Sequence, residues 1–172
     1  MKYSVNWVMW RAFIKPTTCL ECATRNGRIY SYDDLIRIGE PQLHPNCGCW
    51  LERIEAIKAG MATTLGINGA DWWIKYLNRL PNYYISKQQA KQIGWVNKRG
   101  NLSAVAPGYM LCGIYQNKNH QLPEAYGRIW YEADINYTGG YRNRQRLLFS
   151  NDGLVFVTYD HYKTFAEIIG KE

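Results

Sequence analysis

Three kinds of side chain in the C-terminal part of the sequence could together perform acid–base chemistry. Glu132 lies in a stretch of alternating residues, arginines follow at positions 142, 144 and 146, and His161 comes after the last apolar run. A carboxylate can remove the proton from a ribose 2′-hydroxyl, which then attacks the adjacent phosphorus, and a histidine can protonate the departing 5′-oxygen. Cations stabilise the charge that builds up on the phosphoryl oxygens. These residue types suit RNA cleavage without a metal, although each of them alone more often has a structural role.

The stretch that precedes these residues is expected to be helical. The pattern predicts a helix over 70–80 that ends at Pro81. Ser86 can cap a second helix over 87–93, which Gly94 stops.

The residues that carry the chemistry are expected on an antiparallel sheet. Apolar and polar residues alternate over 128–137, which predicts a strand with Glu132 on its polar face. Runs over 146–150 and 154–159 flank Asn151-Asp152-Gly153, a strong hairpin signal. Helices followed by an antiparallel meander give an α+β fold class.

Composition limits the class of protein. The chain has 172 residues, 47% of them hydrophobic, so it can bury a core and is not disordered by composition. Its formal net charge of +7 favours polyanionic partners such as nucleic acid. It lacks a run of about 20 apolar residues, so no membrane span is expected. The stretch 1–14 does not have the pattern of a classical signal peptide.

Four of the five cysteines fall in two clusters near the start of the chain. Cys19 and Cys22 form the first cluster, and Cys47 and Cys49 form the second, with His44 just ahead of it. Two clusters separated by a loop are typical of a structural zinc site with four ligands. We therefore predict zinc on the four cysteines, with His44 as an alternative ligand. A pair of disulfides is the competing interpretation.

A glycine-rich, uncharged stretch separates this cysteine-rich region from the rest. It runs over 60–69 with the sequence GMATTLGING, a composition that suits a linker. The predicted organisation is a cysteine-rich module over 1–60, a linker over 61–69 and a second domain over 70–172.

The segment from about 68 to 169 resembles the barnase-like bacterial extracellular ribonucleases. Six stretches match that family in its order and nearly at its spacing. They are Leu80-Pro-Asn-Tyr-Tyr-Ile-Ser-Lys87, Gly94-Trp-Val96, Gly100-Asn-Leu102, Val105-Ala-Pro-Gly108, Trp130-Tyr-Glu-Ala-Asp-Ile-Asn-Tyr-Thr138 and Asp160-His-Tyr-Lys-Thr-Phe165. The resemblance implies the microbial ribonuclease fold, with N-terminal helices packed on an antiparallel β-sheet. It also implies an endoribonuclease that cleaves single-stranded RNA through a 2′,3′-cyclic phosphate without a cofactor.

The resemblance also implies a role for individual residues. Glu132 matches the general base and His161 the general acid, while Asp134 matches a buried structural aspartate. Four further positions match residues that contact the phosphate, the transition state or the base: Arg142, Arg146, Lys87 and Tyr162.

One stretch departs from the family pattern. Residues 109–119 are one residue shorter than in relatives and lack an aspartate. The expected base-recognition loop is Gln116, Asn117, Lys118 and Asn119. Asn119 stands where relatives carry a glutamate that accepts two hydrogens from guanine, whereas an amide offers one acceptor and one donor group. We therefore expect weaker guanine preference. The alternative hypothesis is a phage-derived structural or RNA-binding protein with weak or no turnover.

Residues of about 7–54 resemble the cysteine-rich C-terminal part of phage Mu F-type head morphogenesis proteins. The shared pattern is Thr18-Cys-x-x-Cys22, Asn26-Gly-Arg-Ile-Tyr30 and His44-Pro-Asn-Cys-Gly-Cys49. Such modules stand ahead of toxin domains, so the resemblance implies a secreted or delivered polymorphic toxin that acts in a target-cell cytoplasm. An acidic barstar-like inhibitor or immunity protein is the expected protein partner.

Overall fold

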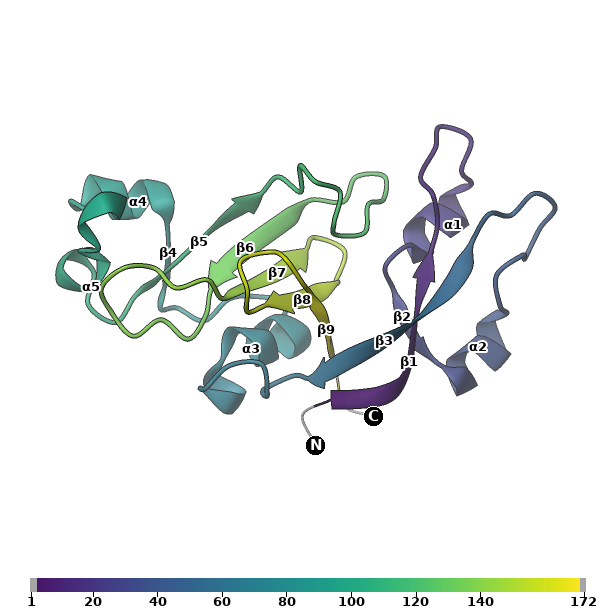
Figure 1. Ribbon diagram of the computed structural model, residues 1–172, viewed down its shortest axis with the longest axis horizontal. Helices are drawn as coiled ribbons and strands as arrows, with labels where there is room; N and C mark the ends of the chain where they lie inside the picture. The colour runs from purple at the N-terminus through teal and green to yellow at the C-terminus, as the bar shows by residue number, and fades with distance from the viewer. Residues whose placement is uncertain (1–2, 171–172) are drawn as a thin grey trace. The chain divides into compact units, whose positions relative to one another are not determined.

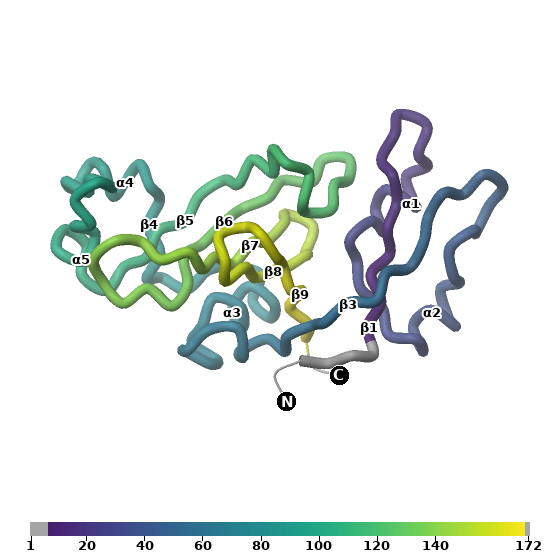
Figure 2. Tube along the Cα trace, in the orientation of Figure 1, coloured from purple at the N-terminus to yellow at the C-terminus, as the bar shows by residue number. Residues whose placement is uncertain are grey.

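The structure is a computed structural model that describes residues 3–170, and its contacts divide the chain into two compact units. The first unit comprises the residues up to Ala56 together with Gln116–Arg128, and the second comprises Ile57–Tyr115 and the residues from Ile129 onward. Figure 1 labels the elements of both units, and Figure 2 traces the path of the chain. The contacts thus group Gln116–Arg128 with the first unit, although this segment lies within the sequence range 70–172 of the predicted second domain.

The first unit is a small α+β module. Its elements are β1 (Tyr3–Arg11), α1 (Leu20–Arg25), β2 (Ile29–Ser31), α2 (Tyr32–Ile38) and most of β3 (Trp50–Lys58), whose last two residues belong to the second unit. The strands lie in the order β2-β1-β3, and β1 and β2 are antiparallel. The core contains Val8, Trp10, Cys22, Leu35 and Cys49.

Both helices of the first unit begin at a side-chain cap. The Cys19 sulfur accepts the backbone N–H of Cys22 at the start of α1. Ser31 and Asp34 form a reciprocal capping box at the start of α2, which satisfies two backbone donors that the helix itself leaves free.

The second unit begins with short helices. Among the described residues these are α3 (Ala70–Leu77), α4 (Lys87–Gln92) and α5 (Leu102–Val105), with 3₁₀ turns at Gly66–Asn68 and Asn97–Arg99. α3 packs against β7, β8 and β9 of the sheet described next.

Six strands of the second unit form its sheet. They are β4 (Tyr84–Ser86), β5 (Met110–Tyr115), β6 (Trp130–Asp134), β7 (Arg146–Ser150), β8 (Val155–Thr158) and β9 (Ala166–Ile169). Their order is β9-β8-β7-β6-β5-β4. All neighbours pair antiparallel except β4 and β5, which are parallel. The predicted α+β class is therefore confirmed, with one parallel pair that the sequence pattern did not indicate.

Several predicted elements are longer than the observed ones. The helix predicted over 70–80 ends at Leu77, because Asn78 takes a left-handed conformation (φ 52°) that terminates the helix. The strand predicted over 128–137 is confined to β6, and Asn136, also left-handed (φ 54°), follows it. The helix predicted over 87–93 ends at Gln92, and its predicted cap at Ser86 is confirmed by a full capping box with Gln89.

The glycine-rich segment 61–69 is folded against α3. The buried Asp71 carboxylate accepts the backbone N–H groups of Gly60 (2.7 Å) and Ala62 (3.0 Å) and the hydroxyl of Thr63 (3.2 Å). Ala62 is itself buried in the core with Ala70 and Ile74. These three hydrogen bonds to a buried carboxylate hold the segment in place, whereas its composition suggested a loose linker.

Candidate active site

Glu132 lies at the centre of β6, where Gly113 of β5 and Leu148 of β7 flank it. Its side chain is buried, with 5% of the residue exposed. Lys87 Nζ donates to Glu132 Oε1 (2.5 Å), and the Tyr162 hydroxyl donates to Oε2 (2.5 Å). The polar face of this strand is therefore enclosed by partners rather than exposed to solvent.

The surroundings of Glu132 keep its carboxyl ionised. Burial by itself would raise the pKa, but the hydrogen bonds from Lys87 and Tyr162 and the charges of Lys87 and Arg142 outweigh burial and hold it below the ordinary value. The same environment raises the pKa of the Tyr162 hydroxyl, through burial and the adjacent carboxylate. Glu132 can therefore accept a proton at neutral pH, and Tyr162 stays protonated.

Two of the predicted arginines share the next carboxylate on β6. Asp134, 1% exposed, accepts Arg142 Nε (2.8 Å) and an Arg142 terminal nitrogen (2.6 Å). Arg146 Nε lies 3.0 Å from the same carboxylate as an ion pair without hydrogen-bond alignment. The Arg142 side chain is 18% exposed and that of Arg146 is 4% exposed. Asp134 therefore orients both guanidinium groups, and Arg142 is the one more open to a ligand.

Asn143 supports this arginine pair and was not singled out in the sequence. Its side-chain amide donates to the carbonyls of Ile135 (2.8 Å) and Asn136 (3.0 Å). Its Oδ1 accepts Arg146 Nη1 (3.2 Å) and the Gln145 N–H (3.0 Å). An asparagine in a polar turn between two strands was the available signal, because such residues often hydrogen-bond to nearby backbone.

His161 and Tyr162 form a turn after β8 in which both residues are left-handed, with φ of 61° and 67°. The His161 N–H donates to the Arg144 carbonyl (3.0 Å), and the Tyr162 N–H donates to Thr158 Oγ1 (3.0 Å). The His161 ring is exposed, and its centroid lies 4.9 Å from that of Tyr162. The turn thus places an exposed imidazole beside the tyrosine that binds Glu132.

Asp160 stabilises the far side of this turn. Its carboxylate accepts the Thr164 hydroxyl (2.7 Å) and the backbone N–H groups of Thr164 (2.9 Å) and Lys163 (3.1 Å). The hydrogen bonds from Thr164 are the main reason that the pKa of Asp160 falls to about 2.

Tyr115, at the end of β5, is a second aromatic residue of the site. Its ring stacks on that of Tyr162, with centroids 5.2 Å apart and planes inclined by 21°. Tyr115 was not among the predicted site residues, and its position at the end of a strand carries no local signal that separates it from core residues.

The structure therefore brings six predicted site residues together in two neighbouring clusters, and the charge of Arg142 in one cluster acts on Glu132 in the other. Glu132, Lys87 and Tyr162 are joined by hydrogen bonds, Arg142 and Arg146 share Asp134, and His161 adjoins Tyr162.

The predicted base-recognition residues lie in the segment that groups with the first unit. Gln116, Lys118 and Asn119 are exposed. Asn117 is buried (6% exposed), and its side chain is engaged with Leu122, donating to the carbonyl (2.9 Å) and accepting the N–H (3.0 Å). Asn117 therefore closes the loop rather than presenting a side chain to a ligand.

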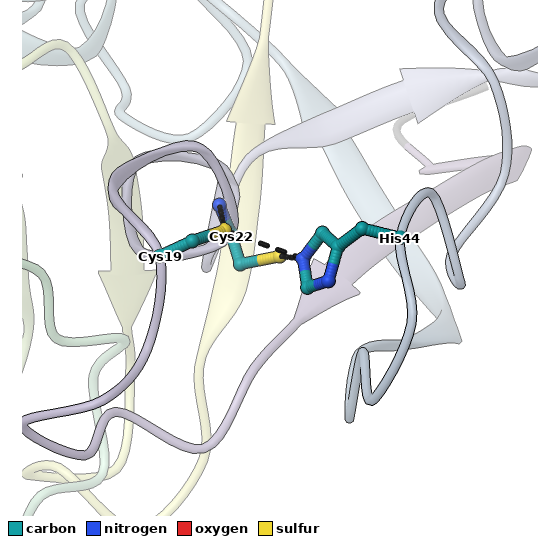
Figure 3. Close-up of side chains that lie close together, drawn as sticks. All are labelled: Cys19, Cys22 and His44. Atoms are coloured by element: carbon teal, nitrogen blue, oxygen red, sulfur yellow. Dashed lines mark hydrogen bonds between the residues drawn. The ribbon is translucent and has the colours of Figure 1, made fainter.

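The predicted metal ligands also converge. Cys19, Cys22 and His44 form one group of donors, and Cys22, Cys47 and Cys49 form another, with all donor atoms of a group within 4.8 Å of each other. His44 Nε2 lies 3.3 Å from Cys19 Sγ and 3.2 Å from Cys22 Sγ (Figure 3).

The spacing of these donors fits a tetrahedral ion. Cys22 Sγ lies 3.8 Å from Cys47 Sγ, and zinc–sulfur bonds of about 2.3 Å at tetrahedral angles require a sulfur–sulfur separation of about 3.8 Å. The Cys47 thiol is also predisposed to lose its proton. Burial opposes this, but hydrogen bonds from the backbone of Cys49 and Gln42 lower its pKa to about 7. The donor set is thus suited to zinc, and Cys22 belongs to both groups.

Within residues 3–170, no helix combines the length and the apolar character needed to cross a bilayer.

Comparison with known proteins identifies the family of the C-terminal part of the chain. A family model described as ribonuclease matches residues 74–169. A ribonuclease of Heyndrickxia coagulans is 52% identical over 100 residues, which cover 58% of this chain and 91% of that protein. Ribonucleases of Bacillus intermedius and Bacillus pumilus are each 51% identical over 100 residues, covering 58% of this chain and 61% of each relative. The resemblance of residues 7–54 to phage head proteins stays a prediction. The matches confirm the predicted endoribonuclease and show that this chain belongs to the barnase-like family of bacterial ribonucleases.

Proposed function

We propose that the chain cleaves single-stranded RNA by metal-independent transphosphorylation, with Glu132 as general base and His161 as general acid. The observation that carries this proposal is the environment of Glu132, a buried carboxylate that Lys87 and Tyr162 hold in place and keep ionised. A base must be unprotonated at the working pH and fixed in position, and this environment meets both requirements.

The proposed step proceeds as follows. Glu132 removes the proton of the ribose 2′-hydroxyl as the 2′-oxygen forms a bond to the adjacent phosphorus. The bond from phosphorus to the 5′-oxygen breaks, and His161 gives its proton to that oxygen. The products are a 2′,3′-cyclic phosphate and a free 5′-hydroxyl. Lys87, Arg142 and Arg146 stabilise the negative charge on the phosphoryl oxygens, and a fixed array of cations does so without reorganisation.

The test uses a defined RNA, a chelator and four proteins. Wild type should cleave and leave cyclic phosphate ends. Glu132→Gln and His161→Gln should each lose about 10²-fold to 10⁴-fold in kcat/KM. Glu55→Gln, which removes the same charge from an exposed position on β3, should match wild type. Cleavage that disappears in chelator, or that survives in both site variants, would refute the mechanism.

The biological role that we propose is that of a delivered toxin acting in a target-cell cytoplasm. The basic composition and the resemblance to modules that precede toxin domains support this role. Induced expression of the chain inside cells should stop growth, and Glu132→Gln should restore it. Equal toxicity of the two proteins would contradict the role.

An acidic barstar-like inhibitor is the proposed protein partner, because a basic nuclease surface attracts an acidic protein. Barstar-type protein titrated into the cleavage assay should inhibit, with an association rate that falls as salt rises. No inhibition at a saturating concentration would contradict this partner.

For the first unit we propose a structural zinc ion on Cys19, Cys22, Cys47 and Cys49, with His44 as the alternative fourth ligand. Zinc would cross-link α1 to the loop before β3, and such sites contribute directly to folding. Metal analysis of the purified chain should find one zinc per chain. His44→Ala and Cys49→Ser then identify the fourth ligand, because only loss of a true ligand weakens zinc retention. Disulfide-linked pairs seen by mass spectrometry without reduction would refute zinc.

A further inference from the structure

The segment that joins β5 to β6, residues Gln116–Arg128, has two parts. We call residues 117–122 its inner loop and residues 123–128 its outer half. The whole segment is called the β5–β6 connection, and it can be followed in green in Figure 2. The inner loop is closed by the two hydrogen bonds between Asn117 and Leu122 and by the His120 N–H donating to the Asn117 carbonyl (2.9 Å). Leu122 is 1% exposed, so the base of this loop is buried.

The outer half of the connection is held by the end of α1. Asn26 follows α1 directly and is 5% exposed. Its side-chain amide donates to the Glu124 carbonyl (2.7 Å), and its own carbonyl accepts Arg128 Nη1 (2.6 Å). Arg128 Nη1 also donates to the Pro123 carbonyl (2.9 Å). A continuous set of hydrogen bonds therefore runs from Asn26 to the residue that follows Leu122.

A role as helix cap does not account for the Asn26 side chain. Its backbone N–H already completes α1 by donating to Cys22 and Ala23, and its φ of −57° is open to any residue type. The side chain is used elsewhere, since Oδ1 accepts the Ala12 N–H (3.0 Å) while Nδ2 reaches Glu124, 98 residues further along the chain. A buried amide with both ends satisfied fixes the two segments that it joins.

Tyr126 supplies a second, independent anchor. Its hydroxyl donates to the Lys15 carbonyl (2.6 Å) and lies 3.3 Å from the Thr18 carbonyl. Thr18 immediately precedes Cys19, one of the candidate metal ligands.

We infer that Asn26, assisted by Tyr126, is a positioning residue that sets the base preference of the nuclease by fixing the β5–β6 connection. The cysteine-rich region then influences base preference through the hydrogen bonds by which it holds this connection. This inference rests on the proposed function and on the base-recognition role that the family resemblance implies for the connection, where Gln116, Lys118 and Asn119 are exposed. Asn26 acts through the connection and contacts no reacting atom.

The test compares the full chain with Asn26→Asp and Tyr126→Phe. Asn26→Asp keeps an acceptor for Ala12 but replaces the donor to Glu124 with an oxygen. Tyr126→Phe removes only a hydroxyl. The matched control is Tyr32→Phe, which removes a hydroxyl from a half-exposed tyrosine of α2 in the same unit.

The first readout is amide hydrogen exchange. Loss of one hydrogen bond should speed exchange over residues 116–128 about threefold to tenfold, while β7 and β8 stay unchanged. The second is the ratio of kcat/KM for guanylyl over adenylyl dinucleotides, which should change by at least about threefold in both variants. A smaller folded fraction lowers both rates equally and leaves this ratio fixed, so the ratio separates positioning from general destabilisation.

The outcomes are distinguishable. Faster exchange with a changed ratio, and an unchanged control, supports the inference. Unchanged exchange in both variants refutes the anchoring, and faster exchange with an unchanged ratio refutes the effect on base preference. If wild type cleaves neither dinucleotide nor longer RNA, the proposed function fails, and hydrogen exchange still decides whether Asn26 anchors the connection.

Discussion

Replacement of Asp134 by asparagine should destabilise the second unit by about 3 kcal/mol. Removal of one partner from a buried ion pair lowers the free energy of unfolding by about 3–5 kcal/mol, because the remaining charge is left buried without an opposite charge. The lower end applies here. The Arg142 side chain is 18% exposed and can turn toward water. Arg146, 4% exposed, keeps the Gln145 carbonyl (2.6 Å) and Asn143 Oδ1 (3.2 Å). A cost of about 3 kcal/mol is about a hundredfold in the unfolding equilibrium.

The assay should report on the second unit alone, because a chain of two units need not unfold in one step. Amide hydrogen exchange of β6 and β7 meets this need, and their slowest amides should exchange about a hundredfold faster in Asp134→Asn. Glu55→Gln on the exposed side of β3 removes the same charge and should leave these amides unaffected. An effect of less than about threefold in Asp134→Asn would show that the arginines do not depend on this carboxylate, and would refute the reasoning.

Three further predictions concern single side chains. Lys87→Met should move the acid limb of the kcat/KM profile to higher pH. Lys87 helps to lower the pKa of Glu132, the base is ionised only above that pKa, and burial raises the pKa once the lysine is removed. An unmoved acid limb would show that Lys87 does not lower the pKa of Glu132. Cys22→Ser should reduce zinc content more than Cys49→Ser, since only Cys22 belongs to both donor groups; equal retention by metal analysis would argue against a shared site. Asn78→Ala should cost about 1 kcal/mol in urea unfolding while Asn78→Gly should be nearly neutral, because position 78 is left-handed; equal stabilities would contradict this.

The features that sequence could predict are those encoded within a few residues. The Ser86 cap needs only Gln89, three positions away, to complete its box. The hairpin needs only the turn that ends at Gly153, whose φ is 96°. Alternation along β6 was enough to put Glu132 on the polar face of the strand.

The features that sequence could not predict depend on distant partners. The Glu132 carboxylate is held by hydrogen bonds from Lys87 and Tyr162, which are 45 and 30 residues away in the sequence. The attachment of the β5–β6 connection to Asn26 spans 98 residues. A single sequence carries no signal for such pairs, since an asparagine after a helix looks like a cap in either case. The segment 61–69 was predicted as a linker for the same reason, because only the fold shows that the Asp71 carboxylate turns back to bind it.

The turn at His161 and Tyr162 couples stability to chemistry. Each left-handed residue with a side chain costs about 1–2 kcal/mol relative to glycine, so the turn holds conformational free energy that the rest of the unit must offset. Glycine at either position would relax that cost and would remove the imidazole or the hydroxyl that binds Glu132. Laboratory evolution for heat tolerance alone should therefore drift toward glycine at these two positions and yield folded, inactive proteins. Selection for cleavage would retain His161 and Tyr162 in their left-handed conformations, and any gain in thermal stability would then have to come from substitutions elsewhere in the chain.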